Sequence, residues 1–288
     1  MLTLTVMSFN ILAASYDQGD VRGWAARADL NVATIRRAAP DVLGVQEMGV
    51  GNLTVYQREL ADYACWLGLT ANPYRDPVTP MRNFYREWWP AIFWKADRFA
   101  LVAGGGFYIS RTLDAAHWYV SHVYDSHYMH PITWCRLRER SDGREFLCFN
   151  THMHHLARTD GNRPLVDAML TLASDTTPVI LTGDFNNTPY LPVRGWTDTA
   201  HRAFLEGGFV DTYRAAGGQD GPEDYTFHGY FGQELPPDVV SDPWRMDWVL
   251  VHPAGRQLTV HDHTIVRDAA PPLYPSDHYP VTARFTLA

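Results

Sequence analysis

Short segments of hydrophobic, often β-branched residues recur along the chain, and their length and two-residue alternation predict β-strands. Glycine, proline and polar residues separate these segments, as expected of turns. The predicted strands span residues 4–11, 42–46, 91–94, 107–110, 132–137, 146–151, 179–182, 248–251 and 281–285.

Helical hydrophobic spacing occurs in three other segments, which are residues 25–38, 54–67 and 164–173. In the last segment Leu165, Met169 and Leu172 fall on one helical face. Pro164 suits a first helical turn, because the N–H that it lacks would have no partner there.

The order of these elements favours an α/β sandwich. Strands and helices do not alternate strictly, so a doubly wound parallel sheet fits poorly, and two sheets packed face to face fit better. We predict a four-layer α/β/β/α sandwich of two mainly antiparallel sheets with helices outside. We expect one domain spanning residues 1–288, with long loops at 72–80 and 217–243 on its functional rim.

Composition agrees with a globular enzyme, since 46% of the residues are hydrophobic and 19% are charged. Residues 1–7 lack the features of a secretory signal, and no apolar run approaches about eighteen residues, so we expect a cytoplasmic protein without membrane insertion. Three irregularly spaced cysteines predict reduced thiols. A net charge of -8 without a basic run argues against tight, sequence-independent nucleic-acid binding.

The sequence Gly-Asp-Phe-Asn directly follows a predicted strand and is typical of a catalytic site. It places Asp184 and Asn186 two residues apart, on one side of an extended chain. Near the C-terminus, Ser-Asp-His sets the possible metal ligand Asp277 beside His278, which titrates near neutral pH. For each motif, a turn that caps a strand is the alternative interpretation.

Polar side chains also stand where three other predicted strands begin or end, namely Asn10, Glu47 and Asp247. Strand ends are where α/β folds often build their sites. Taken alone, Asn10 is better explained as a turn residue, and the alternative for Asp247 is a surface ion pair with Arg245.

Six motifs occur in a fixed order: Ser-Phe-Asn, Gln-Glu, Asn-Thr-His, Gly-Asp-Phe-Asn, Met-Asp-Trp and Ser-Asp-His. This series resembles the endonuclease/exonuclease/phosphatase superfamily over essentially the whole chain, from Met7 to Phe285. The resemblance implies a hydrolase that depends on Mg²⁺ or Mn²⁺, with water attacking a phosphoester in line and no covalent enzyme intermediate. Deoxyribonuclease I, sphingomyelinases, inositol polyphosphate 5-phosphatases and deadenylases belong to the same superfamily.

The resemblance also implies roles for individual residues. Glu47 would be the principal metal ligand, with Asn10 and Asp277 close to it. Asp184 and Asn186 would orient the attacking water and a phosphate oxygen, or hold a second metal. His278, steadied by Asp247, would act as general base or as a donor that polarises the phosphate, and His152 would bind a non-bridging phosphate oxygen.

Within the superfamily the chain is most similar to a bacterial group of uncharacterised members, from which it departs at two positions. His130 stands where that group has an arginine, and His154 stands where it has an aspartate. We therefore list His130, His154, His155 and Arg163 as candidate substrate-binding residues. The run from His152 to His155 also resembles part of a zinc signature, but Leu156 replaces the required aspartate, which disfavours zinc.

Arginines and aromatic residues in the predicted loops are further candidates for substrate contacts. The arginines suited to phosphate oxygens are Arg82, Arg86, Arg158 and Arg163. Aromatic rings could stack on a base or sugar, although packing of loops onto the sandwich is the favoured alternative. These aromatic residues are Tyr74, Phe84, Tyr85, Trp88, Trp89, Trp118, Tyr119, Tyr124, Tyr128, Tyr230 and Trp244.

Three functions were weighed. A metal-dependent phosphoesterase acting on a small phosphomonoester or phosphodiester explains the motifs and the acidic charge together, and it requires no protein partner. A nuclease on DNA or RNA is the alternative. A phosphate-binding protein without catalysis would be expected to have eroded motifs, and all six are intact.

Overall fold

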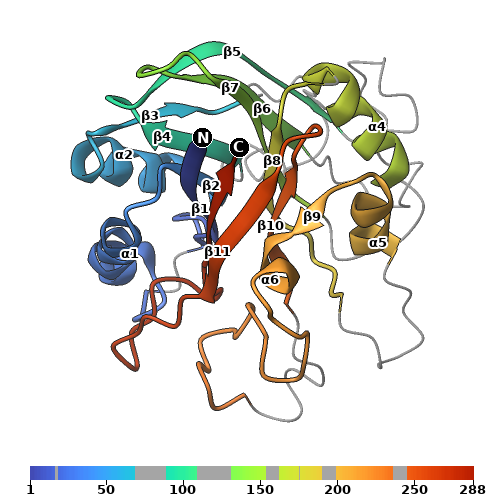
Figure 1. Cartoon of the computed structure of the whole chain (residues 1–288). Coiled ribbons are helices and arrows are strands. Elements are labelled where there is room, and N and C mark those ends of the chain that lie inside the picture. Colours follow the sequence, from blue (N-terminus) through green and yellow to red (C-terminus); the bar gives the residue numbers. More distant parts are fainter. Residues whose placement is uncertain are drawn as a thin grey trace, which may run out of the picture.

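Two six-stranded sheets form the centre of the described part of the chain (Figure 1). The structure is a computed structural model that describes residues 1–16, 19–68, 89–108, 131–153, 162–174, 176–189, 199–235 and 245–288. The first sheet contains, in spatial order, β11 (Leu258–Ile265), β12 (Val281–Leu287), β1 (Leu2–Asn10), β2 (Val42–Met48), β4 (Trp89–Lys95) and β3 (Tyr63–Trp66). The second contains β5 (Phe99–Tyr108), β6 (Pro131–Glu139), β7 (Glu145–His152), β8 (Val179–Asp184), β10 (Asp247–His252) and β9 (Val210–Asp211).

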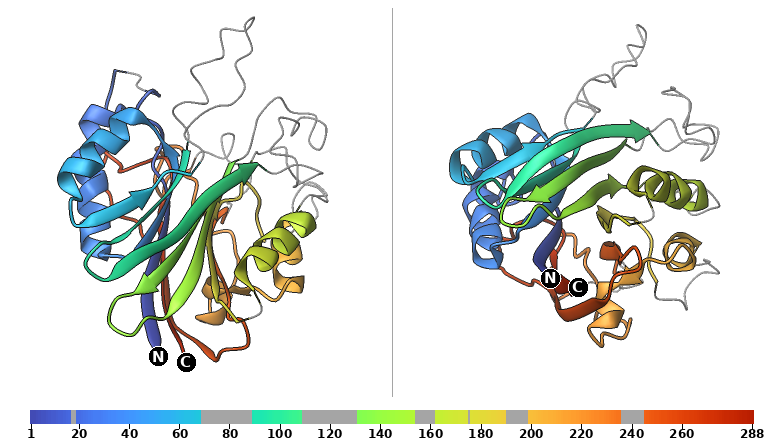
Figure 2. Two further views of the ribbon diagram at one scale, coloured as in Figure 1. Left: turned by 90° about the horizontal axis from the view of Figure 1, so that it is seen from above. Right: turned by 45° about the horizontal axis from the view of Figure 1, so that its top comes forward.

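Each described sheet combines one parallel pair with antiparallel pairs. The parallel pairs are β1 with β2 and β7 with β8. All other neighbouring strands in the two sheets run antiparallel. The termini lie side by side because Leu2 pairs with Leu287 (Figure 2). The predicted sandwich of two mainly antiparallel sheets is therefore confirmed.

Helices cover the outer faces of the sandwich (Figures 1 and 2). The helices on the side of the first sheet are α1 (Trp24–Ala38) and α2 (Val50–Glu59). Those on the side of the second are α4 (Asn162–Ala173), α5 (Thr199–Glu206) and the single turn α6 (Thr212–Ala215). Among the described residues, no helix has the length and apolar character needed to span a membrane.

Alternation along β1 explains how one strand serves two cores. Leu4 and Val6 point between the sheets, into a cluster that includes Phe146 of the second sheet. Met7 and Phe9 point the other way, into the cluster beneath α1 and α2. A third cluster lies between the second sheet and helices α4 and α5. Successive residues of a central strand are thus buried on both faces.

The structure corrects one predicted helix and adds elements that were not predicted. The segment 54–67 is not one helix, because α2 ends at Glu59 and the residues from Tyr63 to Trp66 form β3 against β4. Strand β5 begins at Phe99, well before the predicted start at residue 107. The sequence did not predict β9, β11, α5 or α6, and the predicted loop 72–80 lies outside the described residues.

The three cysteines are free thiols, as predicted. Cys135 and Cys148 are buried opposite each other on β6 and β7, and Cys65 is half-buried on β3.

Candidate active site

The inner faces of both sheets change from apolar to polar at one end of the sandwich. On β1 the inward series Leu4, Val6 continues as Ser8 and Asn10. Strand β8 continues in the same way to Asp184, which pairs with Asp247 at the start of antiparallel β10. Parallel strands end at the same edge of a sheet, so these polar residues meet without any long side chain reaching across the core.

Asn150 on β7 forms a polar floor beneath this end and joins the two sheets. Its side-chain amide donates to the carbonyls of Val45 (2.7 Å) and Ala91 (2.9 Å) in the first sheet. Its amide oxygen accepts from Nε2 of Gln46 (2.7 Å) and from the hydroxyl of Thr182 (3.1 Å). The amide therefore makes four hydrogen bonds while fully buried.

A close approach of the sheets at Gly44 accompanies these bonds. A Cβ atom built on Gly44 would lie 1.9 Å from Oγ1 of Thr182 and 3.0 Å from Oδ1 of Asn150. Only glycine fits this position of β2, so the sheets are held close directly beneath the site.

Asn10 connects two buried carboxylates. Its Nδ2 donates to Oε1 of Glu47 (3.0 Å) and to Oδ2 of Asp184 (2.9 Å), and its Oδ1 accepts from the N–H of Leu12. Glu47 lies where the β2–β4 register shifts and has a φ of 60°. Burial raises the pKa of Glu47 above its ordinary value, opposed by nearby His152.

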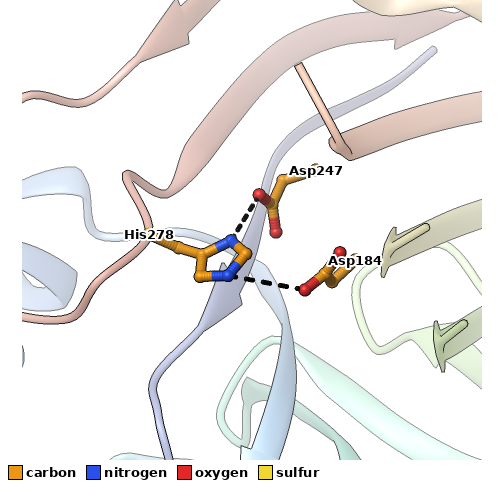
Figure 3. Close-up of side chains that lie close together, drawn as sticks. All are labelled: Asp184, Asp247 and His278. Atoms are coloured by element: carbon orange, nitrogen blue, oxygen red, sulfur yellow. Dashed lines mark hydrogen bonds and ion pairs between the residues drawn. The ribbon is translucent and has the colours of Figure 1, made fainter. Parts of the chain in front are cut away.

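His278 lies between Asp247 and Asp184 (Figure 3). Its Nδ1 is 2.9 Å from Oδ2 of Asp247, and its Nε2 is 3.6 Å from Oδ2 of Asp184. Burial alone would lower the pKa of His278, but Asp247, Asp184 and Asp277 outweigh it and raise the pKa from 6.5 to about 10. In the unliganded protein His278 is therefore a cation at neutral pH, and it donates a proton to Asp247.

Asp247 is fully buried, and its two oxygens have different surroundings. Oδ2 faces His278, while Oδ1 has no hydrogen-bond partner among the described residues. Burial raises the pKa of Asp247, opposed by the positive charge of His278. The backbone N–H of Asp247 donates to the hydroxyl of Thr226, which fixes the start of β10.

Asn186 and His152 form the other wall. The N–H of Asn186 donates to Oδ1 of Asp184 (2.9 Å), and its Nδ2 donates to the carbonyl of Met153 (2.7 Å) and lies 3.0 Å from Nε2 of His152. His152 in turn lies 3.4 Å from Asp184 and 4.0 Å from Glu47. One imidazole thus lies beside both carboxylates that Asn10 connects.

The segment containing Asp277 is fastened to the end of β1. The hydroxyl of Ser276 donates to the carbonyl of Asn10 (2.7 Å). Asp277 lies close enough to Glu47 to raise its pKa. The structure therefore brings together Asn10, Glu47, His152, Asp184, Asn186, Asp247, Asp277 and His278.

Arg27 on α1 is a buried residue of this region that sequence reasoning missed. Its guanidinium donates to the carbonyls of Ile11, Leu12 (2.6 Å) and Pro275 (3.1 Å), and its Nε donates to the carbonyl of Arg22. These bonds tie the chain after Asn10 to the chain before Ser276. The available signal was an arginine within the apolar stripe of a predicted helix.

The ion pair expected between Arg245 and Asp247 is wrong. Arg245 is buried, with 1% of its side chain exposed, and it pairs with Asp211 and Asp220. The carbonyl of Arg245 also accepts from the indole N–H of Trp248, which stacks on Phe185 at 4.2 Å. The side chain of Asp247 is left for His278.

Several other candidates cannot be placed at the site. His130, His154 and His155 lie outside the described residues, as do Arg82, Arg86 and Arg158. Most of the loop aromatics lie there too, whereas Trp89 begins β4 and Tyr230 is described. Arg163 lies on α4 and pairs with Asp167 one turn along the helix.

Comparison with known proteins assigns the family. A family model described as the endonuclease/exonuclease/phosphatase family matches residues 7–278. The chain belongs to this family. The resemblance inferred from the six motifs is thereby confirmed, while the roles of individual residues stay predictions. No curated protein matches the sequence at a significant level.

Solved structures of family members share the fold at low sequence identity. An endonuclease/exonuclease/phosphatase protein from Bacteroides vulgatus matches with a TM-score of 0.78 and 21% identity, covering 100% of both chains. A mannosyl-6-phosphatase of Bacteroides thetaiotaomicron matches with a TM-score of 0.76 and 24% identity, covering 98% of this chain and 99% of its own. TDP2 of D. rerio, complexed with a single-stranded DNA product, matches with a TM-score of 0.70 and 17% identity, covering 99% of this chain and 100% of its own.

Proposed function

We propose that this family member is a divalent-metal-dependent phosphoesterase that hydrolyses a small phosphorylated molecule by in-line attack of water. The observation that carries the proposal is the convergence of buried carboxylates and two imidazoles, from separate strands and loops, at one end of the sandwich. Glu47, Asp184 and Asp247 are each less than a tenth exposed. Such a concentration of buried charge is costly for a fold and is typical of a functional site.

The donor set fits a hard divalent cation. Mg²⁺ and Mn²⁺ prefer carboxylate and amide oxygens, and the site offers both kinds. Burial raises the pKa values of Glu47 and Asp247, so a cation would relieve a real electrostatic cost. Oδ1 of Asp247 is buried without a partner, and Asp184, Asp247 and His278 present ligand atoms within 4.8 Å of one another.

We assign the cation to Glu47, with Asn10 and Asp277 beside it, and Asp184 with Asn186 as the place for a second one. When bound, the cation would stabilise the negative charge that develops on the phosphoryl oxygens.

The remaining residues of the site position the phosphate and handle the proton. Asn186 and His152 bind a non-bridging phosphate oxygen. His278 supplies or accepts a proton at Nε2, because Nδ1 is held by Asp247 at 2.9 Å. Its cationic state in the unliganded protein favours a donor role toward the phosphate.

A small substrate is favoured over nucleic acid by the charge of the chain. The net charge is -8, and binding along a nucleic-acid backbone needs several basic contacts. Arg27 and Arg245, the buried arginines near the site, are occupied by carbonyls and carboxylates. The likeness in fold to a mannosyl-6-phosphatase is consistent with a sugar phosphate.

The test is hydrolysis of a substrate panel with Mg²⁺ or Mn²⁺, and with the metal chelated. The panel contains sugar phosphates, nucleoside monophosphates, glycerol phosphate, bis(p-nitrophenyl) phosphate, a single-stranded oligonucleotide and plasmid DNA. We expect turnover of small phosphates that is lost on chelation. Glu47→Gln and His278→Ala should each lower kcat by about 100-fold or more.

Glu139→Gln is the matched control, because Glu139 is also a buried glutamate but pairs with Arg98 away from the site. It should keep full activity. Cleavage of oligonucleotide at low enzyme concentration without turnover of small phosphates would contradict the substrate class. Equal activity of the parent, Glu47→Gln and His278→Ala would contradict the site itself.

A further inference from the structure

We propose that Tyr230 is a specificity-determining residue whose aromatic ring packs against a ring in the alcohol part of the substrate. The inference rests on the proposed function, because it places that ring beside the residues that would hold the phosphate. The ligand class is a phosphoester whose alcohol carries a sugar ring or a base, since both present a flat face to an aromatic side chain.

Tyr230 lies in a tight four-residue turn that starts at His228. The N–H of Phe231 donates to the carbonyl of His228 at 2.9 Å, which closes the turn. The two central residues, Gly229 and Tyr230, have φ values of 56° and 70°. Two positive φ angles are the pattern of a type I′ turn, which favours Asn and Gly at its centre.

A tyrosine at the second central position is therefore strained. Bulky residues rarely adopt positive φ, and such conformations cost on the order of 1–3 kcal/mol. Asn would make the same turn more cheaply. Strain of this kind is typical of functional sites, where a side chain has to point in one direction. The outlier thus points to a role for the ring itself.

The turn is fastened to the proposed catalytic segment. The N–H groups of His228 and Gly229 both donate to the carbonyl of Asp277, at 2.9 and 3.1 Å. Phe227 forms an isolated β-bridge with His278, and the two rings lie 5.0 Å apart. Tyr230 is consequently held in a fixed position relative to Asp277 and His278.

The ring of Tyr230 extends from Asp277 toward the loop before α1. Its hydroxyl donates to the carbonyl of Arg22 at 3.3 Å, on the far side of the site mouth. The phenol also senses the charges of Arg27, Asp277 and Glu47, which places it beside the proposed cation ligands, and burial raises its pKa so that it stays neutral.

The next residue, Phe231, is 42% exposed, so the turn presents aromatic surface to solvent at the mouth. A ring in the alcohol part of the substrate would cover this surface while its phosphate lies on Glu47 and His278.

The experiment compares Tyr230→Asn with Tyr230→Phe on three phosphates: a sugar phosphate, a nucleoside monophosphate and glycerol phosphate, which has no ring. For Tyr230→Asn we expect kcat/KM on the preferred ring substrate to fall about tenfold or more, mainly through KM, which corresponds to about 1.4 kcal/mol. Glycerol phosphate should change less than about twofold. Tyr230→Phe should keep both values near the parent, because it keeps the ring.

Thermal unfolding separates this role from a structural one. Since Asn relieves the strain of the turn, Tyr230→Asn should keep the parent Tm within a few degrees despite the lost ring. A large fall in Tm with equal losses on ring and ringless phosphates would overturn the proposal. So would unchanged kinetics on all three.

Calorimetric binding of the same phosphates to the parent and both variants gives a second measurement. If the parent hydrolysed none of them, the proposed function would fail on its own. Tyr230 would then be judged by binding, with unchanged affinity in Tyr230→Asn refuting its role and weakened ring binding supporting it.

Discussion

Replacement of Arg27 by Met tests whether one buried guanidinium holds the site together. Arg27 donates to four backbone carbonyls, and those of Ile11 and Pro275 flank Asn10 and Ser276 in sequence. Met keeps an apolar stem of similar length but removes every donor. The change therefore unties the chain after β1 from the chain before Asp277.

The expected loss of stability follows from which carbonyls lose their partner. Pro275 still accepts from Nδ2 of Asn31 at 3.0 Å, so it is not orphaned. The carbonyls of Ile11 and Leu12 lose their short bonds, and an unsatisfied buried acceptor costs about 1–3 kcal/mol. Burial lowers the pKa of Arg27, so removing its charge recovers part of that cost. We expect Arg27→Met to lower the free energy of unfolding by about 2–4 kcal/mol.

The assay combines urea unfolding with calorimetric Mg²⁺ or Mn²⁺ binding. Because Asn10 and Asp277 move apart, cation affinity should fall together with stability. The control is Arg98→Met. Arg98 binds Asp41, Glu139 and the carbonyl of Thr3 at the opposite end of β1, so its loss should lower stability and leave cation affinity unchanged. Unchanged cation affinity in Arg27→Met, or an equal loss in Arg98→Met, would refute the reasoning.

Three further predictions address the cation, the buried histidine and the contact between the sheets. Saturating Mg²⁺ or Mn²⁺ should raise the Tm of the parent, adding about 2.7 kcal/mol at a hundredfold excess over Kd, and Glu47→Gln should abolish the shift in differential scanning fluorimetry. Burial lowers the pKa of His228 from 6.5 to about 3, so its stabilising effect is present above pH 6.5 and falls by about 2 kcal/mol from pH 7 to pH 5; urea unfolding of His228→Phe should lack this fall, and an identical pH dependence would contradict it. Gly44→Ala should cost about 3 kcal/mol or prevent folding, whereas Gly221→Ala, where the nearest atom would be 3.6 Å away, should be neutral by urea unfolding; a stable Gly44→Ala would show that the sheets can separate freely.

The fold could be predicted from sequence wherever a strand lies inside the sandwich. Central strands such as β1 and β8 are buried on both faces, so their apolar runs are long and clear. Edge strand β11 has exposed or half-buried residues throughout and pairs only with β12, so it leaves no comparable pattern. The error at 54–67 has a related cause. The spacing of Tyr56, Leu60 and Tyr63 fits a helix, and only pairing with β4, far along the chain, makes Tyr63 part of a strand.

The candidate site was more predictable than the edges of the fold, because its residues stand at strand ends beside recognisable motifs. The structure brings together all eight residues assigned to metal binding and catalysis. What sequence could not give was the support around them. Arg27 stabilises the site through backbone carbonyls, which have no sequence signature, and Arg245 finds Asp211 and Asp220 only after the chain has folded.

The two parallel pairs explain why the site forms at one end of the sandwich and why it depends on both sheets. The chain leaves β1 and β2 at Asn10 and Glu47, and it leaves β7 and β8 at His152 and Asp184. Metal and phosphate ligands therefore come from different sheets, and their separation depends on the distance between the sheets. Asn150 and Gly44 fix that distance directly below the ligands. The Asn-Thr-His motif thus combines a residue that sets the spacing of the sheets with one that faces the phosphate site.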